Sequence, residues 1–382
     1  MKIVHLADLH LGYRAYHRST ARGVNQREAD VAEAFRRAVA QVVELRPDLV
    51  LIAGDVFHTV RPSNTAIAEA FRQLSVLTGR LPGVPVVMIA GNHDSPRSVD
   101  TGNILCLFRE IENVHVVFEE CRPVKLPDLD ASVLCMPHVS LSVDHRTVIE
   151  PDPRAKHNVL LLHAEVTDNE GEPRYRSEFG GAQVPESAIH PKAWTYVALG
   201  HHHMPAALAP NAWYAGAVER TSAFIWQEKT PKGFLLFDTD TGRVEFQEVE
   251  TRPLVDLPWI EAKGLSATEV DERIRGAVES LEGGIAGKIV RQVVTDVPRV
   301  VVREMNHRRV REWKAEALHF HLDPRPPEVR RRVAVGAPAR RLSLKEQVES
   351  FLGQWTPTRE EIEKERLVAM GGEYVERAAE AG

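Results

Sequence analysis

The chain has 382 residues, enough for roughly two or three domains, and its hydrophobic content of 43% is ordinary for a globular protein with a sizeable core. Cys106, Cys121 and Cys135 are odd in number and far apart, which argues against a disulfide framework or a thiolate zinc site and indicates a reducing cytosol. The formal charge of −6 gives no sign of a nucleic-acid binder but does not exclude one, because net charge averages over local patches.

Three short apolar runs predict buried strands at residues 2–7, 48–54 and 84–91, since each is rich in β-branched residues and ends in turn residues. Helical patterns fill the two gaps, from about Arg27 to Leu45 and over residues 65–79. Strands separated by helices imply βαβ units and a mainly parallel sheet. The first run meets Asp and His too early for a signal peptide, and no apolar run approaches the roughly 18–20 residues of a membrane helix. We therefore expect a cytoplasmic protein with no membrane partner.

Later apolar runs predict six more strands before the composition changes. They are residues 131–136, 157–164, 195–200, 213–217, 233–238 and 243–249. The last two runs flank the turn sequence TDTG, which favours a hairpin. A sandwich of two sheets flanked by helices would accommodate all of these strands, so the fold class we expect is α/β.

A boundary is expected at ETRPLVDLPW, residues 250–259, because this segment carries two prolines. The pattern beyond it indicates a small α+β domain. Its expected elements are helices at about 267–281 and 302–317 and strands at 288–298 and 318–323.

The remaining chain predicts a linker and two helices. Residues 324–341 are rich in Pro, Arg and Ala and show little periodicity, whereas 342–355 and 358–377 have helical patterns. The chain is therefore divided into four parts. They are a core domain at 1–252, a small domain at 253–325, a linker at 326–341 and a helical pair at 342–382.

Metal-type side chains follow five of the expected strands at their C-terminal ends. They belong to the blocks DLH (8–10), GDVFH (54–58), GNHD (91–94), His163 and GHHH (200–203). In an α/β sheet these strand ends converge on one edge, so the five blocks indicate a single site. Carboxylate, imidazole and amide oxygen suit Mn, Fe, Zn or similar metals. Seven such donors are too many for one metal with an open position, but two metals sharing one aspartate can use them and clamp a phosphate ester.

The order of these blocks resembles the calcineurin-like metallophosphoesterase superfamily. Within it, VHLADLHLGYRAYHRSTARGVNQREAD (4–30), DLVLIAGDVFHTVRPSN (48–64) and YAGAVERTSA (214–223) are similar to the SbcD-type nuclease subunits of DNA double-strand-break repair and their archaeal and eukaryotic relatives. The resemblance is strong over residues 1–250 and weak beyond them. It implies a two-sheet β-sandwich flanked by helices, a small α+β capping domain and a C-terminal helical pair.

The resemblance also assigns ligands to two Mn²⁺ ions, with other divalent metals possible. One ion takes Asp8, His10, Asp55 and His203, and the other takes Asp55, Asn92, His163 and His201. Asp55 therefore bridges the ions. In an extended segment alternate residues point the same way, so His201 and His203 are expected to face the metals and His202 to point away.

Three further residues beside the ligands receive roles from the resemblance. His93 would sit over the scissile phosphate and stabilise or protonate the leaving oxygen, and His58 would position the substrate phosphate. Asp94 is expected to orient His93 or a ligand.

The basic loop GYRAYHRSTARG, residues 12–23, lies beside the first ligands. Tyr13, Arg14 and His17 in this loop are expected to contact the DNA backbone, with a solvated loop as the alternative. Basic clusters recur at 303–314 and 330–341, and the small domain corresponds in position to the family's capping domain, which touches DNA.

Two helical regions are interpreted as partner surfaces. In the 65–79 helix we expect Ile67, Phe71, Leu74 and Leu77 on one face, and Ala66, Ala70 and Leu77 as a second apolar face for a homodimer; the alternative is a simple core helix. In the C-terminal pair, apolar surface comes from Val348, Phe351, Leu352, Trp355, Ile362, Leu367, Val368 and Tyr374. The resemblance implies that this pair docks on the coiled coil of an SMC-like ATPase of the SbcC type, with packing on the small domain as the alternative.

The expected function is a Mn²⁺-dependent exonuclease and single-strand endonuclease that processes DNA ends, associated with the nucleoid. One alternative is a phosphoprotein or nucleotide phosphatase on the same scaffold, which would show no preference for DNA. The other is a non-catalytic DNA-end tether, which would lack some ligands, whereas none of the expected positions is substituted here.

Overall fold

The computed structural model describes residues 1–96, 102–141, 149–175, 180–327, 343–354 and 364–380. They belong to two compact units, Met1–Pro327 and Glu328–Gly382, which are described separately. None of the helices in the described ranges combines the length and apolar character that a membrane crossing needs.

The first sheet of the larger unit has six strands in the order β14-β13-β1-β2-β3-β4. Its parallel part consists of β1 (Lys2–Leu6), β2 (Leu49–Ala53), β3 (Val86–Ile89) and β4 (Val114–Val117). The hairpin of β13 (Gly233–Asp238) and β14 (Arg243–Glu248) adds to β1 in the antiparallel direction. The expected parallel sheet and terminal hairpin are therefore confirmed.

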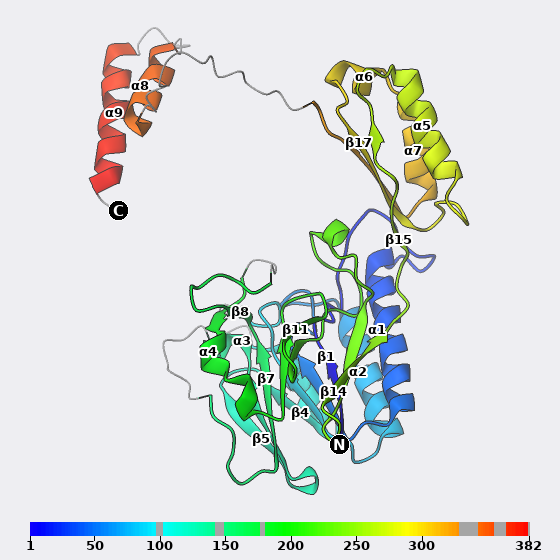
Figure 1. Cartoon of the computed structure of the whole chain (residues 1–382), viewed down its shortest axis with the longest axis vertical. Coiled ribbons are helices and arrows are strands. Elements are labelled where there is room, and N and C mark those ends of the chain that lie inside the picture. The colour runs from blue at the N-terminus through cyan, green and yellow to red at the C-terminus, as the bar shows by residue number, and fades with distance from the viewer. Residues whose placement is uncertain (97–101, 142–148, 176–179, 328–342, 355–363, 381–382) are drawn as a thin grey trace. The chain divides into compact units, whose positions relative to one another are not determined.

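The second sheet has the order β11-β12-β10-β7-β6-β5 and faces the first (Figure 1). Its strands are β5 (Arg122–Leu126), β6 (Ala131–Met136), β7 (His157–His163), β10 (Tyr196–Gly200), β11 (Ala206–Ala209) and β12 (Ala212–Tyr214). One buried cluster joins Ile3 and Leu51 of the first sheet to Val133, Leu161 and Ala198 of the second. The two-sheet sandwich is thus built on the inner faces of both sheets.

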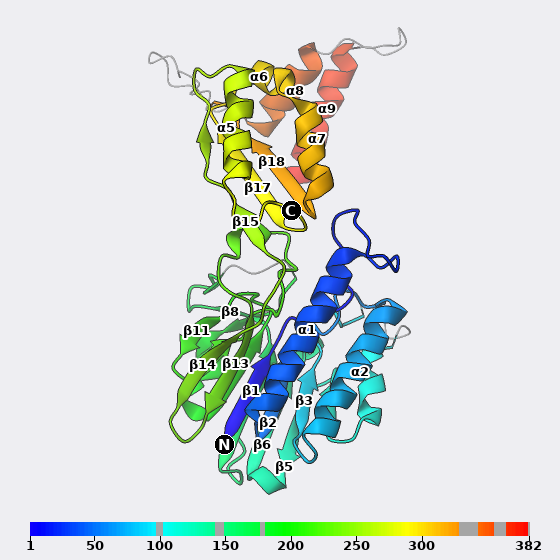
Figure 2. The ribbon, with the colours of Figure 1, turned by 90° about the vertical axis from the view of Figure 1, so that its right-hand side faces the viewer.

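Helices α1 (Gln26–Leu45) and α2 (Asn64–Arg80) cover the outer face of the first sheet (Figure 2). Successive strand residues point to opposite faces, so Val4 and Leu6 pack against the helices while Ile3 faces the other sheet. Asn25 caps α1 by accepting from the amides of Arg27 and Glu28. On the far side of the second sheet lie β8 (Glu165–Thr167), β9 (Gln183–Pro185) and α4 (Glu186–Ile189).

The orientation of α2 corrects one expectation. Ala66 and Ala70, expected on a second, exposed face, are buried together with Leu74 and Leu77, whereas Phe71 is 37% exposed. Small side chains are needed on the inner face, because a Cβ placed on Gly12 would lie only 3.2 Å from the Cβ of Ala66. The inner face also carries the larger Leu74 and Leu77, whereas Phe71 turns partly outward.

Residues 254–324 form a separate four-stranded sheet with its own helices, here called the cap. Around β17 (Ile289–Thr295) the strands β15 (Leu254–Asp256), β16 (Ile260–Glu261) and β18 (His319–Pro324) all run parallel. The helices are α5 (Ala267–Glu279), α6 (Arg299–Glu304) and α7 (His307–Glu316). The single helix expected at 302–317 is wrong, because Asn306 caps a new helix through the amide of Arg309.

The basic loop 12–23 contacts the cap. The ring of Tyr16 stacks on His319 with centroids 3.9 Å apart, and the guanidinium of Arg18 donates to the carbonyls of Lys314, Ala315 and Ala317. This loop therefore has a structural role in addition to any contact with a ligand.

The smaller unit contains α8 (Leu344–Gln354) and α9 (Lys364–Glu380). They pack closely, since a side chain at Gly371 would collide with Leu352. The pair leaves Leu344, Phe351 and Tyr374 exposed by 65%, 69% and 80%. Several expected features lie wholly or mostly outside the described residues. They are the linker at 326–341, its basic cluster, Trp355 and Ile362.

Candidate metal centre

The expected ligands come together where the strands of the two facing sheets end. Asp8 and His10 follow β1, Asp55 follows β2, Asn92 follows β3, His163 ends β7, and His201 and His203 follow β10. Asp8, His10, Asp55 and His201 have positive φ angles of 51°, 46°, 51° and 95°. Non-glycine residues rarely adopt this region, and where they do the strain is often stored at functional sites.

The ligands divide into two groups. The ligand atoms of Asp8, His10 and His203 lie within 4.8 Å of one another, and so do those of Asp55, His163 and His201. Asp55 reaches both groups, because its Oδ2 is 3.4 Å from Nε2 of His163 and 3.8 Å from Nε2 of His10.

Asn92 belongs to the second group. Its Oδ1 lies 2.9 Å from Nε2 of His163 and 3.1 Å from Nδ1 of His201. The structure therefore brings together the residues of the two ligand sets that the family resemblance implies, with the carboxylate of Asp55 between them, and a third group of His10, His58 and His93 lies alongside. The ligand roles themselves stay a prediction.

The donors fit divalent cations. Asp8 and Asp55 are 0% and 1% exposed, and buried carboxylates are costly unless they are paired or bind a metal. Nε2 of His10 and Nε2 of His203 face each other at 3.0 Å, as ligands of one ion would. Nδ1 of His201 lies toward Oδ1 of Asn92, and its Nε2 has no hydrogen-bond partner among the described residues.

Burial and neighbouring charges set the protonation of these histidines. Burial lowers the pKa of His201 to about 3 and, together with the charge of His203, holds the pKa of His10 well below its usual value. Burial also acts to lower the pKa of His163, but the negative charge of Asp55 outweighs it and raises this pKa to about 9. His10 and His201 are thus neutral and ready to bind a cation, whereas His163 must first lose a proton.

Two glycines in the motifs make room for the ligands. A side chain at Gly91 would collide with the carboxylate of Asp55, and one at Gly54 would collide with the ring of His163. The Gly-Asp and Gly-Asn pairs of the sequence are therefore required by close packing around Asp55.

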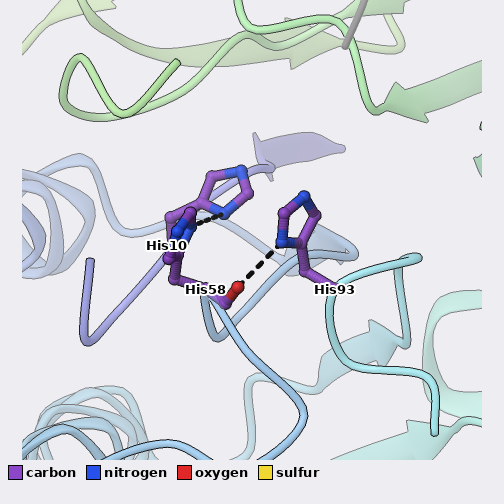
Figure 3. Close-up of side chains that lie close together, drawn as sticks. All are labelled: His10, His58 and His93. Atoms are coloured by element: carbon purple, nitrogen blue, oxygen red, sulfur yellow. Dashed lines mark hydrogen bonds between the residues drawn. The ribbon is translucent and has the colours of Figure 1, made fainter. Parts of the chain in front are cut away.

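His10, His58 and His93 lie side by side on three separate loops (Figure 3). The backbone amide of His93 donates to Oδ1 of Asp55 at 2.9 Å, and its Nδ1 lies 2.8 Å from the carbonyl of His58. A proton on Nδ1 is the form that can donate to this carbonyl. The ring of His58 stacks on that of His93 at 5.2 Å, and burial and the charge of His93 lower the pKa of His58 to about 4.

Asp94 has partners that the sequence did not suggest. Its carboxylate accepts from the backbone amides of Val56, Phe57 and Gly91 at 3.0, 2.9 and 3.0 Å. It is fully buried and joins the loop after β2 to the loop after β3. Asp94 therefore supports the two loops that carry Asp55 and Asn92, and its expected role of orienting His93 or a ligand stays a prediction.

His202 belongs to neither ligand group. It is buried, stacks on Tyr175 at 5.2 Å and meets Tyr214 edge-on at 5.5 Å. The reason differs from the one expected, since β10 ends at Gly200 and the positive φ of His201 turns the chain. His201 and His203 therefore contact different donor groups from a turn, whereas an extended segment was expected to direct both at the metals.

The three residues expected to touch DNA are placed differently from one another. Tyr13 packs edge-on against His58 at 4.9 Å and so adjoins the metal centre. Nε of Arg14 donates to Glu28 at 2.7 Å, although the side chain remains 61% exposed. His17 is exposed.

Sequence reasoning missed three residues near the centre. Glu228 and Lys232 are buried behind His203, and the backbone amide of His138 donates to the carbonyl of Ala90 next to the Asn92 turn. Burial and the charge of His163 lower the pKa of His138 to about 4. The sequence signal for these residues was weak. Glu228 and Lys232 lie in irregular segments, and His138 begins α3 (His138–Leu141), which is too short to show a helical period.

Comparisons with known proteins point to one family. The family model of calcineurin-like phosphoesterases matches residues 1–205. The DNA double-strand break repair protein Mre11 of Archaeoglobus fulgidus is 30% identical over 348 residues, which cover 81% of this chain and 72% of that protein. The protein of the same name from Methanopyrus kandleri is 27% identical over 319 residues, covering 78% and 65% of the two chains. The one from Haloferax volcanii is 30% identical over 295 residues, covering 74% and 58%.

Proposed function

Because the chain belongs to the calcineurin-like phosphoesterase family and, within it, to the Mre11 nucleases, we propose that it is a two-metal nuclease that processes DNA ends. The observation that carries the proposal is the position of Asp55 between two groups of buried donors. Two divalent cations held there would polarise a phosphodiester and supply the attacking hydroxide. The mixture of carboxylate, imidazole and amide ligands suits Mn²⁺, which we propose as the working metal.

The histidines beside the metal groups would act on the phosphate. His93 is held through its backbone by Asp55 and through its ring by the carbonyl of His58, so its ring is fixed next to both ligand groups. We assign it the stabilisation or protonation of the leaving oxygen. His58, which stacks on His93 and touches His10, would position the phosphate.

Exposed basic residues support DNA as the substrate. On the cap, Arg303, Arg308, Arg311 and Lys314 are exposed on or next to α7, and loop 12–23 brings Tyr13 to the metal centre. Arginine, lysine and tyrosine are common donors to phosphate oxygens. A phosphatase for small esters has no need of such a surface, so we favour the nuclease over the phosphatase alternative.

The function is tested by comparing substrates. With Mn²⁺, the purified chain is expected to cleave linear and single-stranded DNA, and chelation is expected to abolish cleavage. Rapid turnover of p-nitrophenyl phosphate without any cleavage of DNA would instead favour the phosphatase.

We also propose that α8 and α9 dock on an SMC-like ATPase of the SbcC type. The support is the apolar surface that this pair exposes, to which Leu344, Phe351 and Tyr374 contribute. Amphipathic helices that lay an apolar face into a groove are a common recognition mode.

Deletion of residues 342–382 is expected to abolish binding to such an ATPase subunit while leaving Mn²⁺-dependent cleavage of single-stranded DNA unchanged. The reason is that α8 and α9 form a unit separate from the metal centre. Co-purification with the subunit and cleavage assays on the same preparations measure both effects. Loss of nuclease activity in a folded deletion variant would contradict the assignment.

The outer face of α2 is proposed as a homodimer surface. Ile67, Phe71, Val76 and Leu107 line a shallow apolar depression there, and Phe71, Val76 and Leu107 are at least 36% exposed. Such a patch on the surface is typical of an interaction site.

Phe71→Glu is expected to convert a dimer into a monomer without loss of folding, because the charge would have to be buried in the interface. Mass photometry at nanomolar concentration measures the change. Val300→Glu, which alters an exposed apolar residue of the cap, is the matched control and should remain dimeric. A wild-type chain that stays monomeric at micromolar concentration would refute the dimer.

A further inference from the structure

His203 has a buried carboxylate behind it. Its Nε2 faces His10 at 3.0 Å, and its Nδ1 lies 3.7 Å from Oε1 of Glu228. Glu228 is 4% exposed and follows a short 3-10 turn at Ile225–Gln227. The two ring nitrogens of His203 therefore point to different environments, one toward the ligand group and one toward an acid.

Lys232 fixes this acid in place. Its ammonium group forms an ion pair with Glu228 and donates to the backbone carbonyl of His203 at 2.7 Å. Lys232 is only 1% exposed. One lysine thus holds both the carboxylate behind His203 and the main chain of His203 itself.

A purely structural role explains this arrangement poorly. Buried ion pairs are often no more stabilising than apolar residues of the same volume, because both charges lose their hydration. A carboxylate behind a ligand imidazole has a separate use: it fixes the tautomer, orients the ring and strengthens it as a ligand. His163 has a closer contact of this kind with the main chain, since its Nδ1 lies 2.7 Å from the backbone carbonyl of Ala53. Nδ1 of His203 has no hydrogen-bond partner among the described residues and faces the carboxylate of Glu228 at 3.7 Å.

We propose that Glu228, held by Lys232, is a positioning residue that keeps the proton of His203 on Nδ1 and directs Nε2 at the cation of the Asp8–His10–His203 group. The proposal rests on the proposed function only in that it requires a divalent cation at this group. It predicts an asymmetry, because the group of Asp55, His163 and His201 has no contact with Glu228 among the contacts of the described residues.

The test is metal binding by the full chain without DNA. Isothermal titration with Mn²⁺ is expected to show two sites in the wild type. In Glu228→Gln, one site should weaken by about 10–100-fold, as is usual when the outer partner of a ligand is changed, and the other should keep its affinity. Glu228→Asp keeps the charge next to Lys232 but withdraws the carboxylate from His203. Glu228→Asp should show the same loss of Mn²⁺ affinity at one site, and it replaces Glu228→Gln in the test if Glu228→Gln does not fold.

Glu69→Gln provides the matched control. Glu69 is also a buried, ion-paired glutamate, but it lies on α2, where it pairs with Arg36 of α1 and Arg72 of α2. This variant is expected to keep both Mn²⁺ affinities even where its thermal stability falls. The proposal would be overturned if folded Glu228→Gln and Glu228→Asp kept the wild-type Mn²⁺ affinity at both sites. It would also be overturned if both sites lost affinity to the same extent.

The two proposals fail in different ways. A wild-type chain that binds two Mn²⁺ ions but cleaves no DNA would refute the proposed function and leave the role of Glu228 open to the same titration. A wild-type chain that binds no divalent cation would refute both.

Discussion

Replacement of Asp55 by asparagine is expected to abolish nuclease activity and to reduce bound Mn²⁺ from two ions per chain to none. The carboxylate lies between the two ligand groups, 3.4 Å from Nε2 of His163 and 3.8 Å from Nε2 of His10. An amide has no negative charge to share between two cations. Because each 1.36 kcal/mol of lost transition-state stabilisation lowers the rate tenfold, and metal ions contribute several kcal/mol, the loss should be on the order of 10³-fold or more.

The measurement combines metal analysis of the purified variant with cleavage of end-labelled DNA. Asp48→Asn is a suitable control, since Asp48 is exposed and its carboxylate accepts from the amide of Lys2. It should retain both ions and full activity. Two tightly bound ions in the Asp55→Asn variant would contradict the bridging role.

The second large effect is expected for His93→Leu, which should lose about 10²–10⁴-fold in cleavage rate and still bind two Mn²⁺ ions. The ring nitrogens of His93, His10 and His58 lie within 4.8 Å of one another, but His93 is not a member of either ligand set that the family resemblance implies. Removal of its ring therefore removes a group that acts on the substrate without removing a ligand. Single-turnover cleavage with saturating DNA separates this loss from any loss of binding.

The histidines that follow β10 give this prediction its controls. His202→Ala should keep both ions and most of the activity, because His202 packs on Tyr175 and Tyr214. His203→Ala should lose one ion. If His93→Leu loses an ion as well, His93 is a ligand and the assignment of roles is wrong; if it cleaves DNA at the wild-type rate, His93 takes no part in the reaction.

The parts of the structure that could be predicted from sequence depend on local patterns. β1, β2 and β3 are short buried runs, and their polar residues follow at the strand ends, where a parallel sheet brings them together. The assembly of Asp8, Asp55 and Asn92 at one edge follows from this rule without any knowledge of side-chain geometry.

The parts that could not be predicted depend on tertiary contacts. The buried face of α2 depends on tertiary contacts such as the one between Ala66 and Gly12, which no helical period reveals. β15 and β16 span only 3 and 2 residues, too few for a pattern. Glu228 lies 25 positions beyond His203 in an irregular loop, so its contact with that histidine exists only in the folded chain.

The most direct test of the two-metal nuclease is incubation of an end-labelled blunt duplex and an end-labelled single strand with the purified chain, under Mn²⁺ or under chelator, alone and with the ATPase subunit. The structure predicts metal-dependent cleavage of the single strand by the chain alone and complete loss of cleavage under chelator. No cleavage of either DNA under Mn²⁺, with or without the partner, would contradict the function proposed for this metal centre.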